Sequence, residues 1–126
     1  MKKGFTILEL MIAVVVISIG VLGAYSVVQQ IFSITFISST RLTSAYLAQE
    51  GIEKTRNTRD ANWLQGNDWD DGIVNKSESN ILPKYNRETT ISSNPDGSLK
   101  VSVKVTFSGR GDNQEIIVEE NLYDWK

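Results

Sequence analysis

Glu9 is the residue whose position most needs a chemical explanation. It stands at the edge of an apolar run, residues 10–28, in which only Ser18 and Ser26 carry polar side chains. The next charged residue along the chain is Arg41. A carboxylate at the edge of a membrane-like segment is costly and usually has a function. We therefore expect Glu9 to serve a purpose other than solvation.

The apolar run has the length of a membrane span. As a helix with a rise of about 1.5 Å per residue, residues 10–28 would extend roughly 28 Å. The hydrocarbon core of a bilayer is about 30 Å thick. Lys2 and Lys3 precede the run, and cytoplasmic flanks are enriched in Lys and Arg. The sequence thus predicts a single-pass protein of the inner (plasma) membrane with a cytoplasmic N-terminus.

Two simpler interpretations of this segment stay open. A secretory signal peptide would end at a small-residue site such as Leu22-Gly23-Ala24, and the mature chain would begin near Tyr25. The uncharged stretch continues to Thr40, which disfavours that interpretation. A bitopic anchor would instead keep Met1 and hold an extracellular binding or adhesion domain that does not polymerise.

Composition argues against several other functions. The chain has no His and no Cys, so the commonest general base and all thiolate sites are absent. The balance of 13 Lys+Arg against 15 Asp+Glu does not favour direct nucleic-acid binding. Asp68, Asp70 and Asp71 lie before Gly72, but a solvated turn explains this cluster better than a calcium loop. We expect no enzyme activity, no cofactor and no metal.

Positions 2–11, Lys-Lys-Gly-Phe-Thr-Ile-Leu-Glu-Leu-Met, resemble the prepilin cleavage motif of type IV pilins and type II secretion pseudopilins. The resemblance implies that a prepilin peptidase cuts between Gly4 and Phe5 and that Phe5 is then N-methylated. It also implies that Glu9 pairs with the Phe5 ammonium of a neighbouring subunit. The stretch from Leu47 to Glu53 resembles minor pilins of the PilV kind.

This resemblance implies a structural role. The chain is expected to be a minor subunit of a type IV pilus-like filament or of a type II secretion pseudopilus. Its partners would be the membrane, the prepilin peptidase, other pilin or pseudopilin subunits and the assembly machinery. After extraction from the membrane, the subunit would lie in an extracellular or periplasmic filament.

A long helix is expected to follow the motif. No Pro occurs before Pro83, which predicts a helix from Phe5 to about Arg59. The predicted organisation is a leader at 1–4, a transmembrane and assembly half at 5–28, an amphipathic half at 29–59, and a loop with a β head at 60–126. The predicted contact stripe of the amphipathic half comprises Leu42, Ala45, Gln49, Ile52 and Arg56, flanked by Tyr46 and Ala48.

The last third of the chain predicts antiparallel strands. Alternating apolar residues mark a strand over residues 99–108, and flanking strands are expected from Tyr85 to Ser92 and from Glu115 to Tyr123. Residues 60–83 are expected to form a turn-rich loop pinned by Trp63 and Trp69. The predicted fold class is α+β, the pilin ladle fold: a long N-terminal helix, its apolar half protruding, packed by its C-terminal half on a sheet of about three strands.

Overall fold

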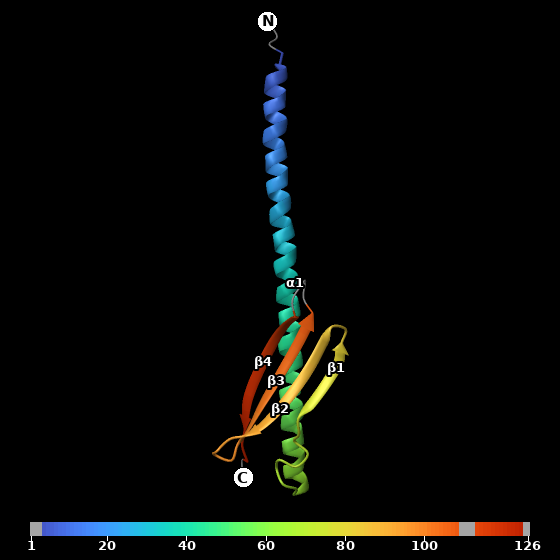
Figure 1. Cartoon of the computed structure of the whole chain (residues 1–126), viewed down its shortest axis with the longest axis vertical. Coiled ribbons are helices and arrows are strands. Elements are labelled where there is room, and N and C mark those ends of the chain that lie inside the picture. The colour runs from blue at the N-terminus through green and yellow to red at the C-terminus, as the bar shows by residue number, and fades with distance from the viewer. Residues whose placement is uncertain (1–3, 109–112, 125–126) are drawn as a thin grey trace. The chain divides into compact units, whose positions relative to one another are not determined.

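The computed structural model describes residues 4–108 and 113–124. It contains one helix, α1 (Ile7–Gln65), and four strands. The strands are β1 (Lys76–Leu82), β2 (Tyr85–Ser93), β3 (Leu99–Ser108) and β4 (Asn113–Leu122), as Figure 1 shows. The chain divides into two compact units after Ser38.

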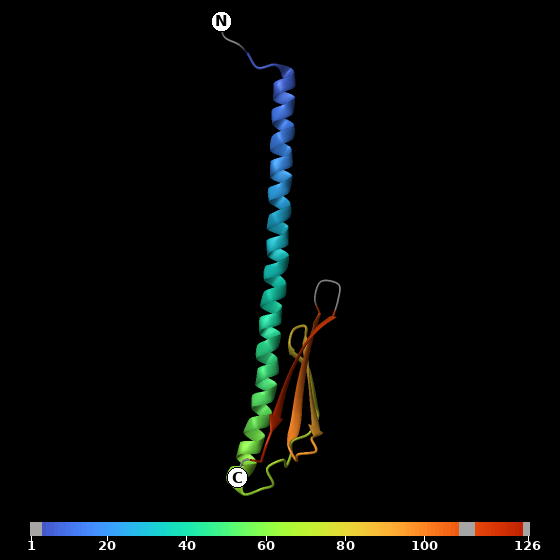
Figure 2. The ribbon, with the colours of Figure 1, turned by 90° about the vertical axis from the view of Figure 1, so that its left-hand side faces the viewer.

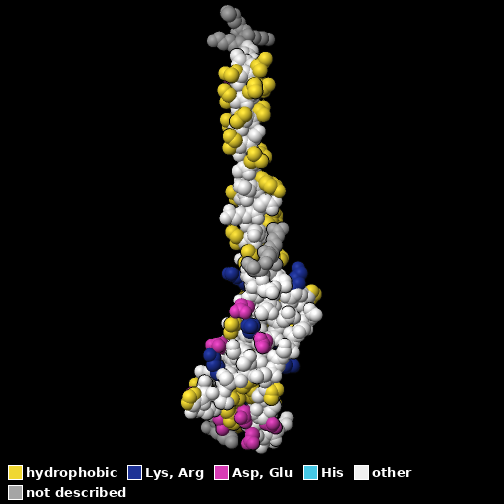
Figure 3. Space-filling model, viewed as in Figure 1, with side chains coloured by type: hydrophobic (Ala, Val, Ile, Leu, Met, Phe, Trp, Pro, Cys, Tyr) yellow, Lys and Arg dark blue, Asp and Glu magenta, His cyan; other side chains and the backbone are white. Residues whose placement is uncertain are grey.

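The first unit consists of the N-terminal part of α1 and the residues before it. Every residue from 4 to 32 is exposed. Hydrophobic side chains line this part of the helix in Figure 3, whereas Lys, Arg, Asp and Glu gather over the second unit. Helix α1 is long and apolar enough to cross a membrane, and none of its most apolar window is buried.

The second unit packs the C-terminal part of α1 on a four-stranded sheet. The strand order is β1-β2-β3-β4, and each strand pairs antiparallel with its neighbour. Thr89 of β2 lies opposite Val103 of β3, which in turn lies opposite Val118 of β4. Figure 2 shows the helix running along one face of this sheet. The α+β fold of a long helix on an antiparallel sheet, as in pilins, is therefore confirmed.

The alternation predicted for residues 99–108 appears directly in the burial of β3. Its odd-numbered side chains face the helix and its even-numbered side chains face outward, as a half-buried strand requires. The core is made of apolar side chains from α1, β3 and β4: Leu47, Ala48, Ile52, Val101, Val103, Val105 and Leu122.

The contact face of α1 agrees with the predicted stripe in part: Ile52 and Ala48 are buried, and Ala45 and Arg56 are half-buried. Leu42, Tyr46 and Gln49 are exposed, whereas the buried positions of the helix are Ser44, Leu47, Ala48, Gly51, Ile52 and Asn62. A prediction from hydrophobicity misses part of this face because small residues, Ser44, Ala48 and Gly51, lie where the helix comes close to the sheet.

Gly51 marks the closest approach. A Cβ built there would lie 2.8 Å from Val103 Cγ1 and 3.0 Å from Arg87 Cδ. No side chain larger than hydrogen fits at that distance without a shift of its neighbours.

The helix also ends later than expected, at Gln65 instead of about Arg59. Gly66 follows with φ +72°, a left-handed conformation that glycine adopts without strain. The Gly66 N–H donates to the Trp63 carbonyl at 3.2 Å, and the Asn67 N–H donates to the Asn62 carbonyl at 3.0 Å. These bonds satisfy carbonyls of the last turn and terminate the helix.

The sheet has four strands, not about three. Strand β1 lies within the segment that the sequence predicts as loop. Its sequence, Lys-Ser-Glu-Ser-Asn-Ile-Leu, has no apolar alternation, and its pairing with β2 is irregular between Glu78 and Leu82. Edge strands are often short, charged and irregular, and such a strand leaves little sequence pattern.

Candidate functional site

Gly4 and Phe5 lie ahead of the helix, in non-helical backbone. The Phe5 side chain is 85% exposed, and a Cβ placed on Gly4 would meet nothing within 4 Å. The peptide bond between them is therefore open to another protein. Lys2 and Lys3, the predicted basic residues of the leader, lie outside the described residues.

Thr6 forms the boundary between this segment and α1. Its carbonyl accepts the Leu10 N–H at 3.1 Å, which is the first hydrogen bond of the helix. Its Oγ1 accepts the Glu9 N–H at 3.2 Å. These two bonds define an N-cap. Sequence reasoning missed this role, although Thr followed three residues later by Glu is a known signal for a helix start.

Glu9 lies in the first turn of α1, where the helix dipole favours an anion. Among the residues that the structure describes, its carboxylate forms no hydrogen bond and no ion pair. The cap uses the backbone N–H of Glu9 and leaves its side chain available. The carboxylate can therefore accept a cation from outside the chain.

Polar side chains in the apolar part of α1 are satisfied within the helix. Ser18 donates to the Val14 carbonyl at 2.7 Å, and Ser26 donates to the Gly23 carbonyl at 2.8 Å. Farther along, Gln29 donates to the Tyr25 hydroxyl at 2.8 Å. A hydroxyl bonded to its own helix can enter a lipid or protein interior without leaving its donor unpaired.

Gly20 and Gly23 have open space around them. Nothing lies within 4 Å of a Cβ built at either position. They therefore have no packing role within the described chain. Small residues of this kind allow close approach between helices in membranes.

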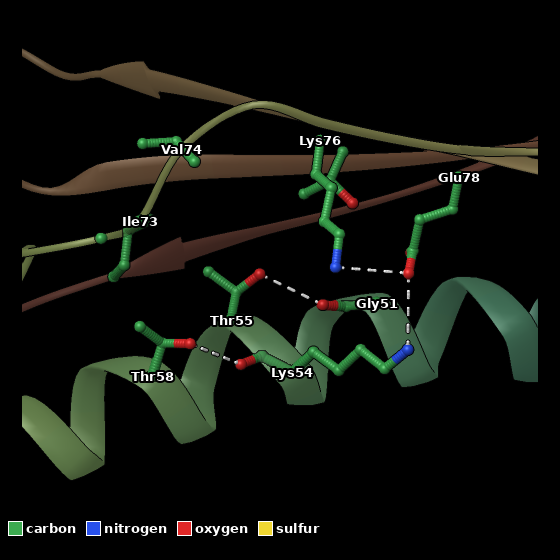
Figure 4. Close-up of a pocket in the computed structure, with 10 residues that line it drawn as sticks. Gly51, Lys54, Thr55, Thr58, Ile73, Val74, Lys76 and Glu78 are labelled. Carbon is green, nitrogen blue, oxygen red and sulfur yellow. Dashed lines mark hydrogen bonds and ion pairs between the residues drawn. The ribbon is translucent and has the colours of Figure 1, made fainter.

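A small cavity of about 180 Å³ lies in the second unit, between α1 and the segment leading into β1. Figure 4 shows its polar side chains turned toward one another. Lys54 Nζ lies 2.9 Å from a Glu50 oxygen and 3.7 Å from a Glu78 oxygen, and Lys76 Nζ lies 3.5 Å from that Glu78 oxygen. The hydroxyl of Thr55 donates to the Gly51 carbonyl. The two lysines that line the cavity, Lys54 and Lys76, are therefore already paired with carboxylates of the same cluster.

Arg87 is the centre of this charge cluster and was not singled out by the sequence. Its side chain is fully buried under α1. The Arg87 Nε donates to Glu78 Oε2 at 2.7 Å, and Nη1 donates to the Leu47 carbonyl at 2.9 Å. Nη2 lies 2.5 Å from Glu78 Oε2, without hydrogen-bond alignment. Arg87 thus joins β1, β2 and α1.

The cluster shifts the acidity of its carboxyl groups. Burial raises the pKa of Glu78, but the hydrogen bond and charge of Arg87, with Lys54 and Lys76, outweigh that effect and lower the pKa overall. The hydrogen bond from Lys54 is the main cause that lowers the pKa of Glu50, and Arg87 adds to it. Both groups are therefore held in the charged form.

The cations near the end of α1 belong to structural ion pairs. Arg56 pairs with Glu53 and Glu120, each at 2.6 Å, and thereby links α1 to β4. Arg59 pairs with Asp60 at 2.9 Å. The last turn of α1 contains no basic residue.

The acidic turn after α1 is organised by Asn62. Its Nδ2 donates to the carbonyls of Asp71, at 2.6 Å, and Trp69, at 3.3 Å. In the described ranges, no group of three acidic side chains is placed to hold a metal ion. Trp69 packs against the core as predicted, whereas Trp63 is 45% exposed. The aspartates therefore belong to a turn held by Asn62.

One family model matches the chain. Residues 1–25 match the model described as the prokaryotic N-terminal methylation motif. The match covers Gly4, Phe5 and Glu9, and the chain therefore carries the type IV pilin signature. Neither the curated proteins nor the solved structures that were compared with the chain give a match.

Proposed function

From the type IV pilin signature at its N-terminus, we propose that this chain is a structural subunit of a type IV pilus-like filament or of a type II secretion pseudopilus. It is matured by cleavage between Gly4 and Phe5 and by N-methylation of Phe5. It serves as a minor subunit of that filament. The observation that carries the proposal is the match of residues 1–25 to the N-terminal methylation motif.

The exposed apolar surface of α1 supports this function. Large hydrophobic side chains from Phe5 to Ile37 are mostly more than half exposed, which is rare in a soluble protein. Before assembly, the lipid bilayer covers the apolar surface. After assembly, the helices of neighbouring subunits cover it. A membrane anchor and an assembly surface therefore use the same side chains at different stages.

Maturation changes the charge at the helix start. The cut removes Lys2 and Lys3 and creates an ammonium on Phe5. That ammonium must first lose a proton, so that the free amine can attack the methyl group of an electrophilic methyl donor. The donor's leaving group departs, and the N-methylated nitrogen carries one positive charge as before. The Glu9 carboxylate of a neighbouring subunit is the counter-ion, and its lack of a partner among the described residues supports this assignment.

The subunit follows a defined route in the cell. The cytoplasmic N-terminus meets the prepilin peptidase, and α1 holds the subunit in the inner membrane until the assembly machinery extracts it. The second unit lies on the outer side of that membrane throughout. Proteins that carry this N-terminal motif are structural and not catalytic. A filament subunit needs no cofactor.

Fractionation of cells tests this proposal. The chain, tagged at its C-terminus, is expressed with and without a prepilin peptidase, and membranes and sheared surface filaments are probed separately. The proposal predicts the chain in the filament fraction only when the peptidase is present. An uncut chain confined to the membrane in both strains would favour a bitopic anchored domain that does not polymerise.

A further inference from the structure

Thr6 is the only strong N-cap residue within the first ten positions of the chain. Ser, Thr, Asn and Asp lead at the N-cap, where Gly is only modestly enriched. Among residues 1–10, Thr6 alone belongs to the first group, and Gly4 is the nearest alternative. In the structure Thr6 is the cap and the helix begins at Ile7, whereas a cap at Gly4 would begin the helix at Phe5.

The two registers differ at the carbonyl that a peptidase must attack. With Thr6 as the cap, the Thr6 carbonyl accepts the first helical hydrogen bond, from the Leu10 N–H at 3.1 Å. Within the described part of the chain, the Gly4 carbonyl then accepts no hydrogen bond. With Gly4 as the cap, the Gly4 carbonyl would take the equivalent bond from the Leu8 N–H, and Phe5 would become the first helical residue.

We infer that Thr6 is a positioning residue for cleavage at Gly4–Phe5, and this inference rests on the function proposed above. The Thr6 cap holds the start of α1 at Ile7 and so keeps the scissile peptide outside the helix, with Phe5 and Thr6 between that bond and the first helical residue. Hydrolysis adds water across the Gly4–Phe5 amide. Gly4 leaves as a carboxylate, and the Phe5 nitrogen leaves as an amine that takes up a proton.

The cap lies on the mature side of the cut. Both bonds that define it, from the Glu9 N–H to Thr6 Oγ1 and from the Leu10 N–H to the Thr6 carbonyl, involve residues that cleavage retains. The helix therefore keeps its start when the leader departs. The cap also employs the backbone of Glu9 and leaves its carboxylate for a neighbouring ammonium.

Three variants separate capping from recognition of the side chain itself. Thr6→Val keeps the shape and removes the hydroxyl. Thr6→Ser keeps the hydroxyl, and Thr6→Asn supplies a capping oxygen on a different side chain. Thr43→Val is the matched control, because the Thr43 hydroxyl donates to the Ser39 carbonyl within the helix and caps nothing.

The experiment follows cleavage of the full-length chain by a purified prepilin peptidase in detergent micelles, read by mass spectrometry. Backbone chemical shifts of residues 4–8 in the same micelles locate the helix start. Thr6→Val should be cut about fivefold more slowly. Loss of an N-cap changes the equilibrium between the helix that begins at Ile7 and the helix that begins nearer Phe5 by about fivefold. The helix of Thr6→Val should begin nearer Phe5. Thr6→Ser, Thr6→Asn and Thr43→Val should behave like the unmodified chain.

Different results overturn different claims. If the unmodified chain is not cut at Gly4–Phe5, the proposed function fails and this inference fails with it. If it is cut there, but Thr6→Val is cut equally fast, the inference alone fails. If Thr6→Asn is as slow as Thr6→Val while its helix still begins at Ile7, the peptidase reads the threonine directly, and the positioning role is wrong.

Discussion

Arg87 and Glu78 form an asymmetric ion pair, in which the Arg87 side chain is fully buried and the Glu78 side chain is 23% exposed. The Nε–Oε2 distance is 2.7 Å. Glu78 also lies near Lys54 and Lys76, whereas Arg87 depends on Glu78 for its closest carboxylate. Removal of Glu78 and removal of Arg87 should therefore lower the stability of the second unit by different amounts.

Glu78→Gln should destabilise the second unit by about 3 kcal/mol, since it leaves a buried guanidinium without its main counter-charge. Arg87→Met should lower the free energy of unfolding by less, because the Glu78 carboxylate remains partly exposed to solvent and close to Lys54 and Lys76. Urea unfolding of the full chain in detergent micelles measures both. Lys104→Gln, which disturbs only exposed contacts of 3.8 Å, is the control and should change the free energy of unfolding by less than about 1 kcal/mol. An equal or larger loss for Arg87→Met would contradict the asymmetry.

Gly51→Ala should destabilise the same unit by about 1–3 kcal/mol. The added methyl group would lie 2.8 Å from Val103 Cγ1, so the helix must move away from the sheet. Gly23→Ala is the matched control, since nothing lies within 4 Å of a Cβ there. Hydrogen exchange of the β3 amides reports the local stability. Unchanged exchange in Gly51→Ala would show that the packing is looser than the structure indicates.

Strand β3 and Arg87 show what can and what cannot be predicted from the sequence. The alternation from Leu99 to Phe107 predicts β3 and its buried face, because one-sided burial imposes a period of two. Arg87 has no such signal, since a charged residue in a strand is read as facing solvent. Its burial depends on Glu78 from an edge strand that itself lacks apolar alternation. The motif around Gly4 and Glu9 is local, and sequence alone identifies it.

Acid should weaken the second unit through Glu50 and Glu78. The pKa of each is lowered in the folded chain, mainly by Lys54 for Glu50 and, against the cost of burial, by Arg87 for Glu78. Their stabilisation is therefore fully present above the unfolded pKa of about 4.3 and is lost as the pH falls through the folded pKa values. Unfolding midpoints measured from pH 7 to pH 3 should fall at the acid end. Glu78→Gln should have a shallower fall, and an identical slope would refute this assignment.

Glu9→Ala should be cut and inserted normally but enter filaments at least about tenfold less. The reason is that the Phe5 ammonium of a neighbouring subunit would be left unpaired in an apolar interior. Quantitative blotting of membranes and sheared filaments measures the ratio. Glu119→Ala removes an exposed carboxylate from the outer face of β4 and is the control. Normal incorporation of Glu9→Ala would remove the proposed intersubunit pair.

The most direct test of the central claim is the intact mass and N-terminal sequence of the chain recovered from filaments. The account predicts that the mature chain begins at Phe5 and carries one additional methyl group on its terminal nitrogen. A chain that begins at Met1 would be a membrane-anchored domain, and one that begins near Tyr25 would be a secreted protein. Either result would contradict the assignment of this chain as a processed filament subunit.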